Sequence, residues 1–262
     1  MDYGLIGYPL GHSFSKEIHE SIASYTYEIH QLEESEVDSF MKAREFKAIN
    51  VTIPYKQTVI PYLDMMDDNA RTIGACNTIV NRGGKLCGHN TDFSGFEYMV
   101  KKHNIQIEGK KCLCLGDGGA SKAVVAVLKK YNAAEVIIVD IRKTENAITY
   151  DECFEKHTDA EVIVNCTPVG MYPKVDASPV DLTKFPKCEA VADVIYNPLE
   201  TRLVAQAKSL GMIGVNGLEM LVAQAFYAIE FFVETKLPEE KIDEVYQKIY
   251  AEKKAEEDKA GK

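Results

Sequence analysis

The sequence predicts an α/β protein with two domains, and one stretch in its second half carries the strongest evidence. An apolar strand over 111–115 leads into the glycine-rich turn 116–120, which opens a helix over 121–131 and a next strand over 135–140. This is the spacing of a βαβ unit, whose two strands lie parallel in one sheet. Strands and helices also alternate through the rest of the chain, which favours the α/β class with some antiparallel edge.

The length and composition suit two domains that each bury a core. The chain has 262 residues, of which 46% are hydrophobic and 27% charged. Its 30 basic and 40 acidic side chains leave a net charge of −10, which argues against a nucleic-acid partner. Seven cysteines without a CxxC pair or a metal-ligand spacing predict reduced thiols in a cytoplasmic protein and no metal site. Neither a signal peptide nor a membrane span is expected.

Hydrophobic spacing predicts a series of short elements in the first half. They are a strand at 3–6, a helix from 15, a strand near 25–29, a helix over 34–44, a strand over 48–53, a helix over 62–72 and a hairpin of 75–81 with 85–90. Pro54 cannot donate a backbone hydrogen bond, so the strand before it should stop there. A helix over 93–103 then leads toward the second domain.

The second half continues the alternation beyond the βαβ unit. The segment 142–157 is less periodic than a full crossover helix and predicts a trimmed one. Further strands are expected at 159–165, 190–196 and 211–215, and helices at 201–210, 219–234 and 238–253. The highly charged tail 252–259 is expected to fray.

Polar residues gather where two of the predicted strands end. The stretch 50–56 delivers Thr52 and Lys56 at the end of a buried strand, and 89–95 delivers Asp92 at the end of the hairpin. In open α/β folds the carboxyl ends of strands are where ligands bind. A lysine there can bind an anion or exchange protons, although a lone lysine after a strand is more commonly a surface residue.

The glycine turn and Asp140 together indicate a dinucleotide site. Gly116, Gly118 and Gly119 allow a tight turn and let backbone amides approach a pyrophosphate at the helix N-terminus. Asp140 ends the second strand, 24 residues after Gly116, where an acidic side chain can bond a ribose hydroxyl. The GxGGA spacing falls short of the full fingerprint, so the prediction depends on strand, helix and Asp140 together.

Eight short motifs follow one another in a recognisable order. They lie at 7–15, 50–56, 74–78, 90–92, 116–120, 165–171, 196–198 and 216–224. Each is modest evidence alone, but the ordered set resembles the shikimate/quinate dehydrogenase family over nearly the whole chain. The sequence departs from the family pattern at Lys16, Phe93 and Asp117, where a proline, a glycine and a small residue are usual.

The resemblance implies a two-domain enzyme. Residues 1–92 with 219–262 would form a substrate-binding and catalytic domain, and 93–218 a Rossmann-like domain, with the C-terminal helices returning to the first. The implied activity is reversible NADP-linked reduction of 3-dehydroshikimate to shikimate, in chorismate and aromatic amino-acid biosynthesis, by a monomer or homodimer. Two alternatives stay open: an NAD-dependent quinate/shikimate dehydrogenase, and a non-catalytic nucleotide-binding relative.

The resemblance also implies residue roles. Hydride transfer to a ketone builds negative charge on the carbonyl oxygen, where Lys56 would donate a proton while Asp92 orients its ammonium. A structural ion pair is the alternative. Substrate-binding side chains would be those of Ser13, Ser15, Thr52, Asn77, Tyr196 and Gln224. Taken alone, the serines suit helix caps, Tyr196 an interfacial core position and Gln224 an exposed helix face.

Cofactor contacts are expected from the glycine turn and the strand ends that follow it. These residues are Gly116, Asp117, Gly118, Gly119, Ala120, Asp140, Arg142, Thr167, Val194, Gly217 and Met220. Asp140 would repel a 2′-phosphate and suits NAD, whereas Arg142 and Lys143 could hold that phosphate. The family resemblance favours NADP, with NAD as the alternative.

Overall fold

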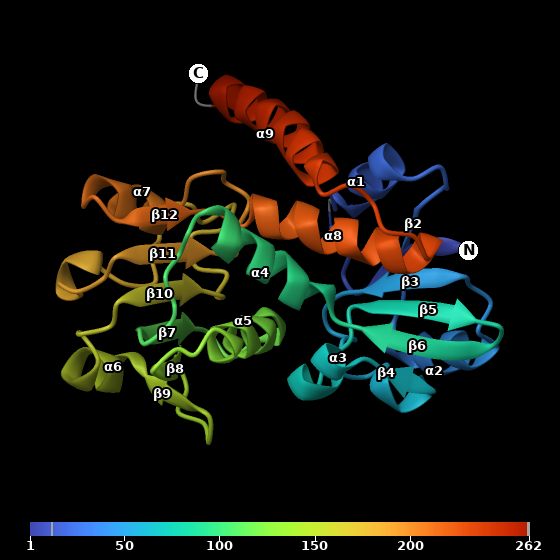
Figure 1. Ribbon diagram of the computed structural model, residues 1–262, viewed down its shortest axis with the longest axis horizontal. Coiled ribbons are helices and arrows are strands. Elements are labelled where there is room, and N and C mark those ends of the chain that lie inside the picture. Colours follow the sequence, from blue (N-terminus) through green and yellow to red (C-terminus); the bar gives the residue numbers. More distant parts are fainter. Residues whose placement is uncertain (12, 261–262) are drawn as a thin grey trace. The chain divides into compact units, whose positions relative to one another are not determined.

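The computed structural model describes residues 1–11 and 13–260, which form two compact units (Figure 1). The first unit is Met1–Gly95 with Val222–Val245, and the second is Phe96–Leu221 with Tyr246–Lys262. Each unit contains one six-stranded sheet, so the expected mixed α/β architecture is confirmed. The predicted division into 1–92 plus 219–262 and 93–218 stays a prediction about the functional domains. His12, within the motif at 7–15, lies outside the described residues.

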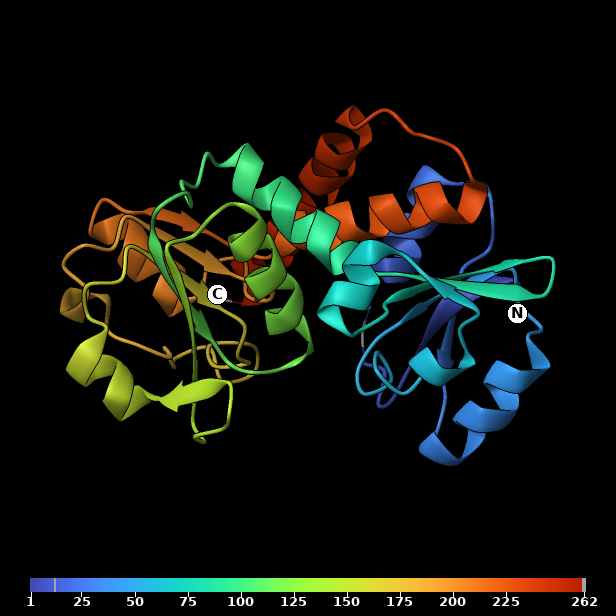
Figure 2. The same ribbon diagram turned by 60° about the horizontal axis from the view of Figure 1, so that its bottom comes forward.

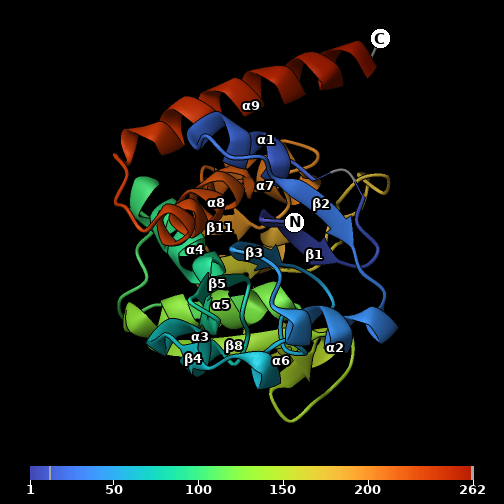
Figure 3. The ribbon, with the colours of Figure 1, turned by 90° about the vertical axis from the view of Figure 1, so that its right-hand side faces the viewer.

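The sheet of the first unit is mixed. Its order is β2-β1-β3-β5-β6-β4, and these strands are β1 (Tyr3–Gly7), β2 (Glu28–Gln31), β3 (Ala48–Val51), β4 (Met65–Met66), β5 (Thr78–Arg82) and β6 (Lys85–His89). β1 pairs in parallel with β2 and β3, and β2 lies at the edge of this sheet (Figure 3). β5 and β6 form the predicted hairpin and pair antiparallel. β3, which leads to the candidate lysine, is buried along its whole length.

Helices of both full and partial length belong to the first unit, and one of them shows recognisable caps at both ends. They are α1 (Ser15–Ile22), α2 (Glu34–Ala43), the 3-10 turn η1 (Ile60–Tyr62), α3 (Asp68–Ile73), and parts of α4 (Thr91–Lys102), α8 (Leu218–Val233) and α9 (Glu240–Ala260). The Asp67 carboxylate accepts from the Ala70 N–H at the start of α3, and Gly74 ends that helix with a positive φ of 65°. A glycine is favoured there because it adopts the left-handed conformation without steric cost.

The sheet of the second unit is parallel throughout. Its order is β12-β11-β10-β7-β8-β9, and these strands are β7 (Lys111–Leu115), β8 (Glu135–Asp140), β9 (Ala147–Thr149), β10 (Val162–Asn165), β11 (Ala190–Asp193) and β12 (Ile213–Val215). The helices here are α5 (Gly119–Lys130), α6 (Tyr150–Lys156) and α7 (Arg202–Ser209), with the 3-10 turn η2 (Leu182–Lys184) and the remaining parts of α4, α8 and α9. α5 packs against β7 and β8 (Figure 2). The strand order reverses between β7 and β10, which is where doubly wound folds bind ligands.

Three predicted elements of the first unit were wrong in detail. The strand placed near 25–29 begins only at Glu28, because Tyr27 is fully buried and its hydroxyl donates to Asn50 Oδ1 at 2.7 Å. The strand over 48–53 ends at Val51, and the Ile53 side chain is 66% exposed. The helix over 62–72 is divided, because Met65–Met66 pair with β6 as a short strand before Asp67 caps α3.

In the second unit, the trimmed crossover helix expected within 142–157 is confirmed as α6, whose capping box joins Thr149 and Glu152, whereas the edge strand β9 in the same segment was not predicted. The expectation of a fraying tail was wrong. The tail is helical through Ala260, and Lys253 within it is only 5% exposed. The charged composition of the tail suggested that all of its side chains face solvent, whereas one face of the helix is buried and holds it in place. Among the described residues, none of the helices is both long and apolar enough to cross a membrane.

Candidate active site

The turn after β3 fixes the backbone of Lys56. The ring of Tyr55 is buried, and its hydroxyl donates to the Leu32 carbonyl at 2.6 Å. The Lys56 carbonyl accepts from the Cys76 N–H at 2.7 Å, which ties the turn to the segment before β5. Because the backbone is held on both sides, the lysine side chain leaves a rigid base.

Asp92 enters from the first turn of α4. Asn90 precedes this helix, and its side chain accepts from the Phe93 N–H at 3.3 Å and donates to the Ala75 carbonyl at 2.9 Å. The Lys56 Nζ and Asp92 Oδ2 atoms are 2.5 Å apart, and these side chains are 16% and 11% exposed. The structure thus brings together the predicted catalytic pair at the N-terminus of α4.

Asn77 holds the start of α4 beside that pair. Its Oδ1 accepts from the Thr91 N–H at 2.7 Å, and its Nδ2 donates to Thr91 Oγ1 at 3.1 Å. The Asn77 carbonyl in turn accepts from Asn50 Nδ2 at 3.2 Å. The predicted substrate amide is therefore 3% exposed and already bonded to the residue that precedes Asp92. This linking role was missed from the sequence, where Thr91 carried no separate signal.

The remaining predicted substrate residues of the first unit occupy separate elements. Ser15 is the first residue of α1 and Phe14 is its N-cap residue, so the alternative that Ser15 caps this helix is wrong. Ser13 Oγ accepts from the Ser15 N–H at 3.2 Å, which leaves the Ser13 hydroxyl proton available to a ligand. Thr52 is half-buried directly after β3, and a side chain at Gly7 would collide with its methyl group. Gln224 is half-buried on α8.

The glycine turn of the second unit forms an open cradle for an anion. Gly116 has a positive φ of 96° and lies against Cys166, so a side chain there would be both strained and crowded. Gly118 is the N-cap residue of α5 and provides no side-chain cap, and nothing lies within 4 Å of where its Cβ would be. The first amides of a 12-residue helix are thus left to an external acceptor such as a phosphate.

The charged residues after β8 have distinct partners. Asp140 accepts at Oδ2 from the Asp117 N–H at 3.0 Å and at Oδ1 from the Arg142 N–H at 3.2 Å. Lys143 forms an ion pair with Glu152 at 2.5 Å. The Arg142 side chain is exposed, and its guanidinium has no partner within residues 1–11 and 13–260. Arg142 is therefore the cation of this turn that remains available.

A buried polar network holds the loops after β10 and β11. Thr167 donates to Asn165 Oδ1 at 2.7 Å, and Asn165 Nδ2 donates to Asp193 Oδ1 at 3.0 Å. Thr201 donates to the other Asp193 oxygen at 2.8 Å. Asp193 is fully buried, and this desolvation raises its pKa to about 6. This role of Asp193 was not predicted from the sequence, where the available signal was an acidic residue at the end of an otherwise apolar strand.

The other predicted cofactor residues lie nearby in the same unit. Gly217 backs onto the Val194 backbone, which any side chain at position 217 would strike. Its N–H donates to the Ile195 carbonyl at 2.9 Å. Met220 is 7% exposed, and Tyr196 follows β11, where burial raises its pKa and keeps its hydroxyl protonated. A close backbone approach therefore explains the glycine of this motif.

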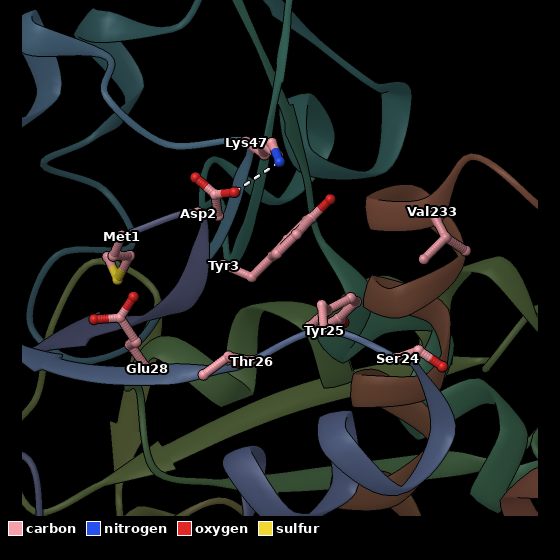
Figure 4. Close-up of a pocket in the computed structure, with 9 residues that line it drawn as sticks. All are labelled: Met1, Asp2, Tyr3, Ser24, Tyr25, Thr26, Glu28, Lys47 and Val233. Carbon is pink, nitrogen blue, oxygen red and sulfur yellow. Dashed lines mark ion pairs between the residues drawn. The ribbon is translucent and has the colours of Figure 1, made fainter.

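An open pocket elsewhere in the first unit is lined by Met1, Asp2, Tyr3, Ser24, Tyr25, Thr26, Glu28, Lys47 and Val233 (Figure 4). Asp2 and Lys47 pair across it at 2.6 Å. No predicted site residue contributes to its lining, so it is separate from the Lys56–Asp92 pair.

His19 is unsuited to acid–base chemistry, because complete burial lowers its pKa to about 3.

Comparison with known proteins agrees with this geometry. The protein-family model described as shikimate dehydrogenase substrate binding domain matches residues 5–79 of this chain. The NADP(+) shikimate dehydrogenase of Clostridium beijerinckii is 37% identical over 90% of this chain and 93% of that protein. A chorismate mutase/shikimate 5-dehydrogenase fusion protein from Clostridium acetobutylicum superposes with a TM-score of 0.90, at 37% identity, over 97% of this chain and 98% of that one.

A third comparison has ligands in its structure. The shikimate 5-dehydrogenase of Thermus thermophilus, in complex with NADP(H) and shikimate, has a TM-score of 0.84 at 28% identity, over 95% of this chain and 99% of that one. Sequence and structure therefore agree over nearly the full length of these proteins. The chain belongs to the shikimate dehydrogenase family.

Proposed function

We propose that this protein is an oxidoreductase that reversibly reduces 3-dehydroshikimate to shikimate with NADP(H). The contact between Lys56 Nζ and Asp92 Oδ2, at 2.5 Å, carries the proposal. Chain segments 36 residues apart meet to form an almost buried ion pair, at the end of a buried strand and the start of a helix. Family membership supplies the substrate class.

Lys56 is the proton donor in this reaction. When bound, the nicotinamide supplies or accepts the hydride at the ring carbon. As the hydride arrives, charge grows on the substrate oxygen, and the Lys56 ammonium stabilises that charge and delivers a proton. Asp92 accepts a hydrogen bond from Lys56 and so fixes the direction of the remaining donors.

Hydroxyl and amide side chains bind the rest of the substrate. We assign the carboxylate to Ser13 and Ser15, with Tyr196 as a further donor, and the ring hydroxyls to Thr52, Asn77 and Gln224. Ser13 supports this assignment because its oxygen is fixed by the Ser15 N–H while its proton stays available. Asn77 keeps one amide proton beyond the one that it gives to Thr91.

The glycine turn and Arg142 support NADP as the cofactor. The uncapped start of α5 fits the pyrophosphate, and the unpartnered Arg142 guanidinium fits the 2′-phosphate. Both Asp140 oxygens already accept backbone N–H groups, which offset its charge and reduce the repulsion expected from the sequence. The NAD-dependent alternative is not favoured, because the Clostridium beijerinckii relative is named for NADP(+).

Location and assembly are part of the same proposal. The cysteines of the described residues are unpaired, which supports a reducing, cytoplasmic environment. We propose a monomer or homodimer acting on a small molecule, without nucleic acid. The functional division into a substrate domain and a cofactor domain is tested by mapping ligand-dependent hydrogen exchange onto 1–92, 93–218 and 219–262.

The direct test measures reduced-nicotinamide absorbance with shikimate, using NADP and NAD in turn. We expect turnover with NADP, and a loss of about 10²–10⁴ in kcat for Lys56→Ala, which is the usual contribution of a proton-transferring side chain. Shikimate binding, measured by calorimetry, should persist in the variant. Absence of turnover with either cofactor, on shikimate and on quinate, would refute the dehydrogenase assignment.

A further inference from the structure

The C-terminal part of α9 contacts the loop that carries Tyr196. Lys253 Nζ donates to Asn197 Oδ1 at 3.0 Å, and the Glu257 carboxylate accepts from the Leu199 N–H at 2.7 Å. Lys253 and Glu257 are four residues apart on one helix, so they lie on the same face. All of these groups belong to the second unit.

The loop between β11 and α7 is held on its other side as well. The Ile195 N–H donates to Asp193 Oδ1 at 3.0 Å, and the Asn197 carbonyl accepts from the Tyr172 N–H at 3.1 Å. The Leu199 carbonyl accepts from Asn216 Nδ2 at 2.6 Å. Hydrogen bonds from other segments therefore hold the residues before and after Tyr196, and α9 supplies those to the residue next to it and to the residue three positions beyond it.

A buried lysine such as Lys253 is unusual in a helix that only covers apolar surface. The residue is 5% exposed, and burial lowers the pKa of its ammonium group. An apolar side chain would be buried there at lower cost, because it would lose no hydration. A hydrogen bond from a buried cation is directional, so it fixes the position of Asn197 more closely than apolar packing does.

We propose that Lys253 and Glu257 form a clamp of two positioning residues, which holds the loop 194–200 so that Tyr196 meets the substrate. This rests on the proposed function, in which Tyr196 binds the substrate carboxylate. Neither clamp residue touches substrate. Both act through the backbone and side chain of the loop, and the C-terminal helix thereby becomes part of substrate recognition.

The test compares Lys253→Met and Glu257→Gln in the full chain with matched controls on the same helix. Lys254→Met and Glu256→Gln make the same two substitutions at neighbouring positions whose side chains are exposed. A lost hydrogen bond to a charged group corresponds to about a tenfold change in affinity. We expect the shikimate KM to rise about tenfold in each clamp variant, with kcat and the NADP KM within about twofold of wild type.

Hydrogen–deuterium exchange supplies a readout that does not depend on activity. Exchange over 194–201 should accelerate in Lys253→Met and Glu257→Gln while the controls match wild type, because the Leu199 N–H loses its protection. A double-mutant cycle of Lys253→Met with Asn197→Ala should be non-additive in shikimate KM. Additive effects, or a KM unchanged from the controls despite faster exchange, would overturn the positioning role.

Failure of the proposed function is distinguishable from failure of the clamp. An inactive wild-type protein whose clamp variants still show faster exchange over 194–201 would reject the dehydrogenase assignment and with it the role in substrate recognition. An active wild type whose clamp variants exchange normally would reject the clamp alone.

Discussion

Replacing Asp92 with asparagine separates the charge of the catalytic pair from its shape. The amide can still accept a hydrogen bond from Lys56, but it no longer carries the negative charge that orients the ammonium group. In the native protein the two groups are 2.5 Å apart and 16% and 11% exposed. The pair thus lies between the exposed ion pairs that contribute little and the fully buried ones whose disruption is costly.

The expected magnitudes follow from that exposure. Exposed pairs contribute about 0–1 kcal/mol and loss of one partner of a buried pair costs about 3–5 kcal/mol. An intermediate loss of about 2 kcal/mol in the free energy of unfolding is therefore expected for Asp92→Asn. The loss in kcat should be larger, about 10²–10³-fold or about 3–4 kcal/mol of barrier, because misdirected donors stabilise the developing oxyanion poorly.

Asp64 provides the matched control. It pairs with Arg44 at 2.8 Å, at 37% and 35% exposure, and accepts from the Leu86 N–H, whose hydrogen bond is the main reason that the pKa of Asp64 is lowered. Asp64→Asn should change stability little, because the pair is exposed, and should leave kcat unchanged. Denaturant unfolding measures the stability of both variants, and steady-state assays measure their kcat. Equal, small losses of kcat in the two variants would refute the catalytic role of Asp92.

Three further changes test other parts of the structure. Arg142→Ala should weaken NADP binding about tenfold in calorimetry and leave NAD unchanged, whereas Lys143→Ala, which removes a cation already paired with Glu152, should change NADP affinity little; equal losses for both cofactors would contradict the 2′-phosphate assignment. Gly217→Ala should destabilise the protein by about 1–3 kcal/mol, because its methyl group strikes the Val194 backbone, and unchanged thermal unfolding would contradict that packing. His19 should make stability depend on pH: its folded pKa of about 3 lies below the ordinary 6.5, so the unfolded chain binds a proton that the folded one rejects, and stability is lost as pH falls below 6.5. The difference in unfolding free energy between wild type and His19→Gln should then change by up to about 1.4 kcal/mol per pH unit between pH 6.5 and 3, and a constant difference would exclude it.

The elements that sequence predicted well are those whose signal is local. The βαβ unit around the glycine turn needs only an apolar strand, a turn that tolerates positive φ and a helix with an apolar face, and all three appear in contiguous residues. The hairpin of β5 and β6 is similar, because its turn at Gly83 and Gly84 adopts positive φ. Errors arose where a distant partner decides, as with Tyr27, which is buried and bonded to Asn50 instead of extending a strand.

The candidate site divides along the same line. The residue types at the strand ends, including Lys56, Asp92, the glycine turn and Asp140, can be predicted from the amino-acid order, because polar residues after apolar strands are visible along the chain. Which of these residues touch depends on how the chain folds in space. The tertiary structure closed the Lys56–Asp92 pair, bonded Asn77 to Thr91, occupied the Asp140 oxygens with amides and buried Lys253 in a tail that composition assigned to solvent. Spacing along a chain does not specify distances in space, and the charge of a side chain does not reveal which face of its helix is covered.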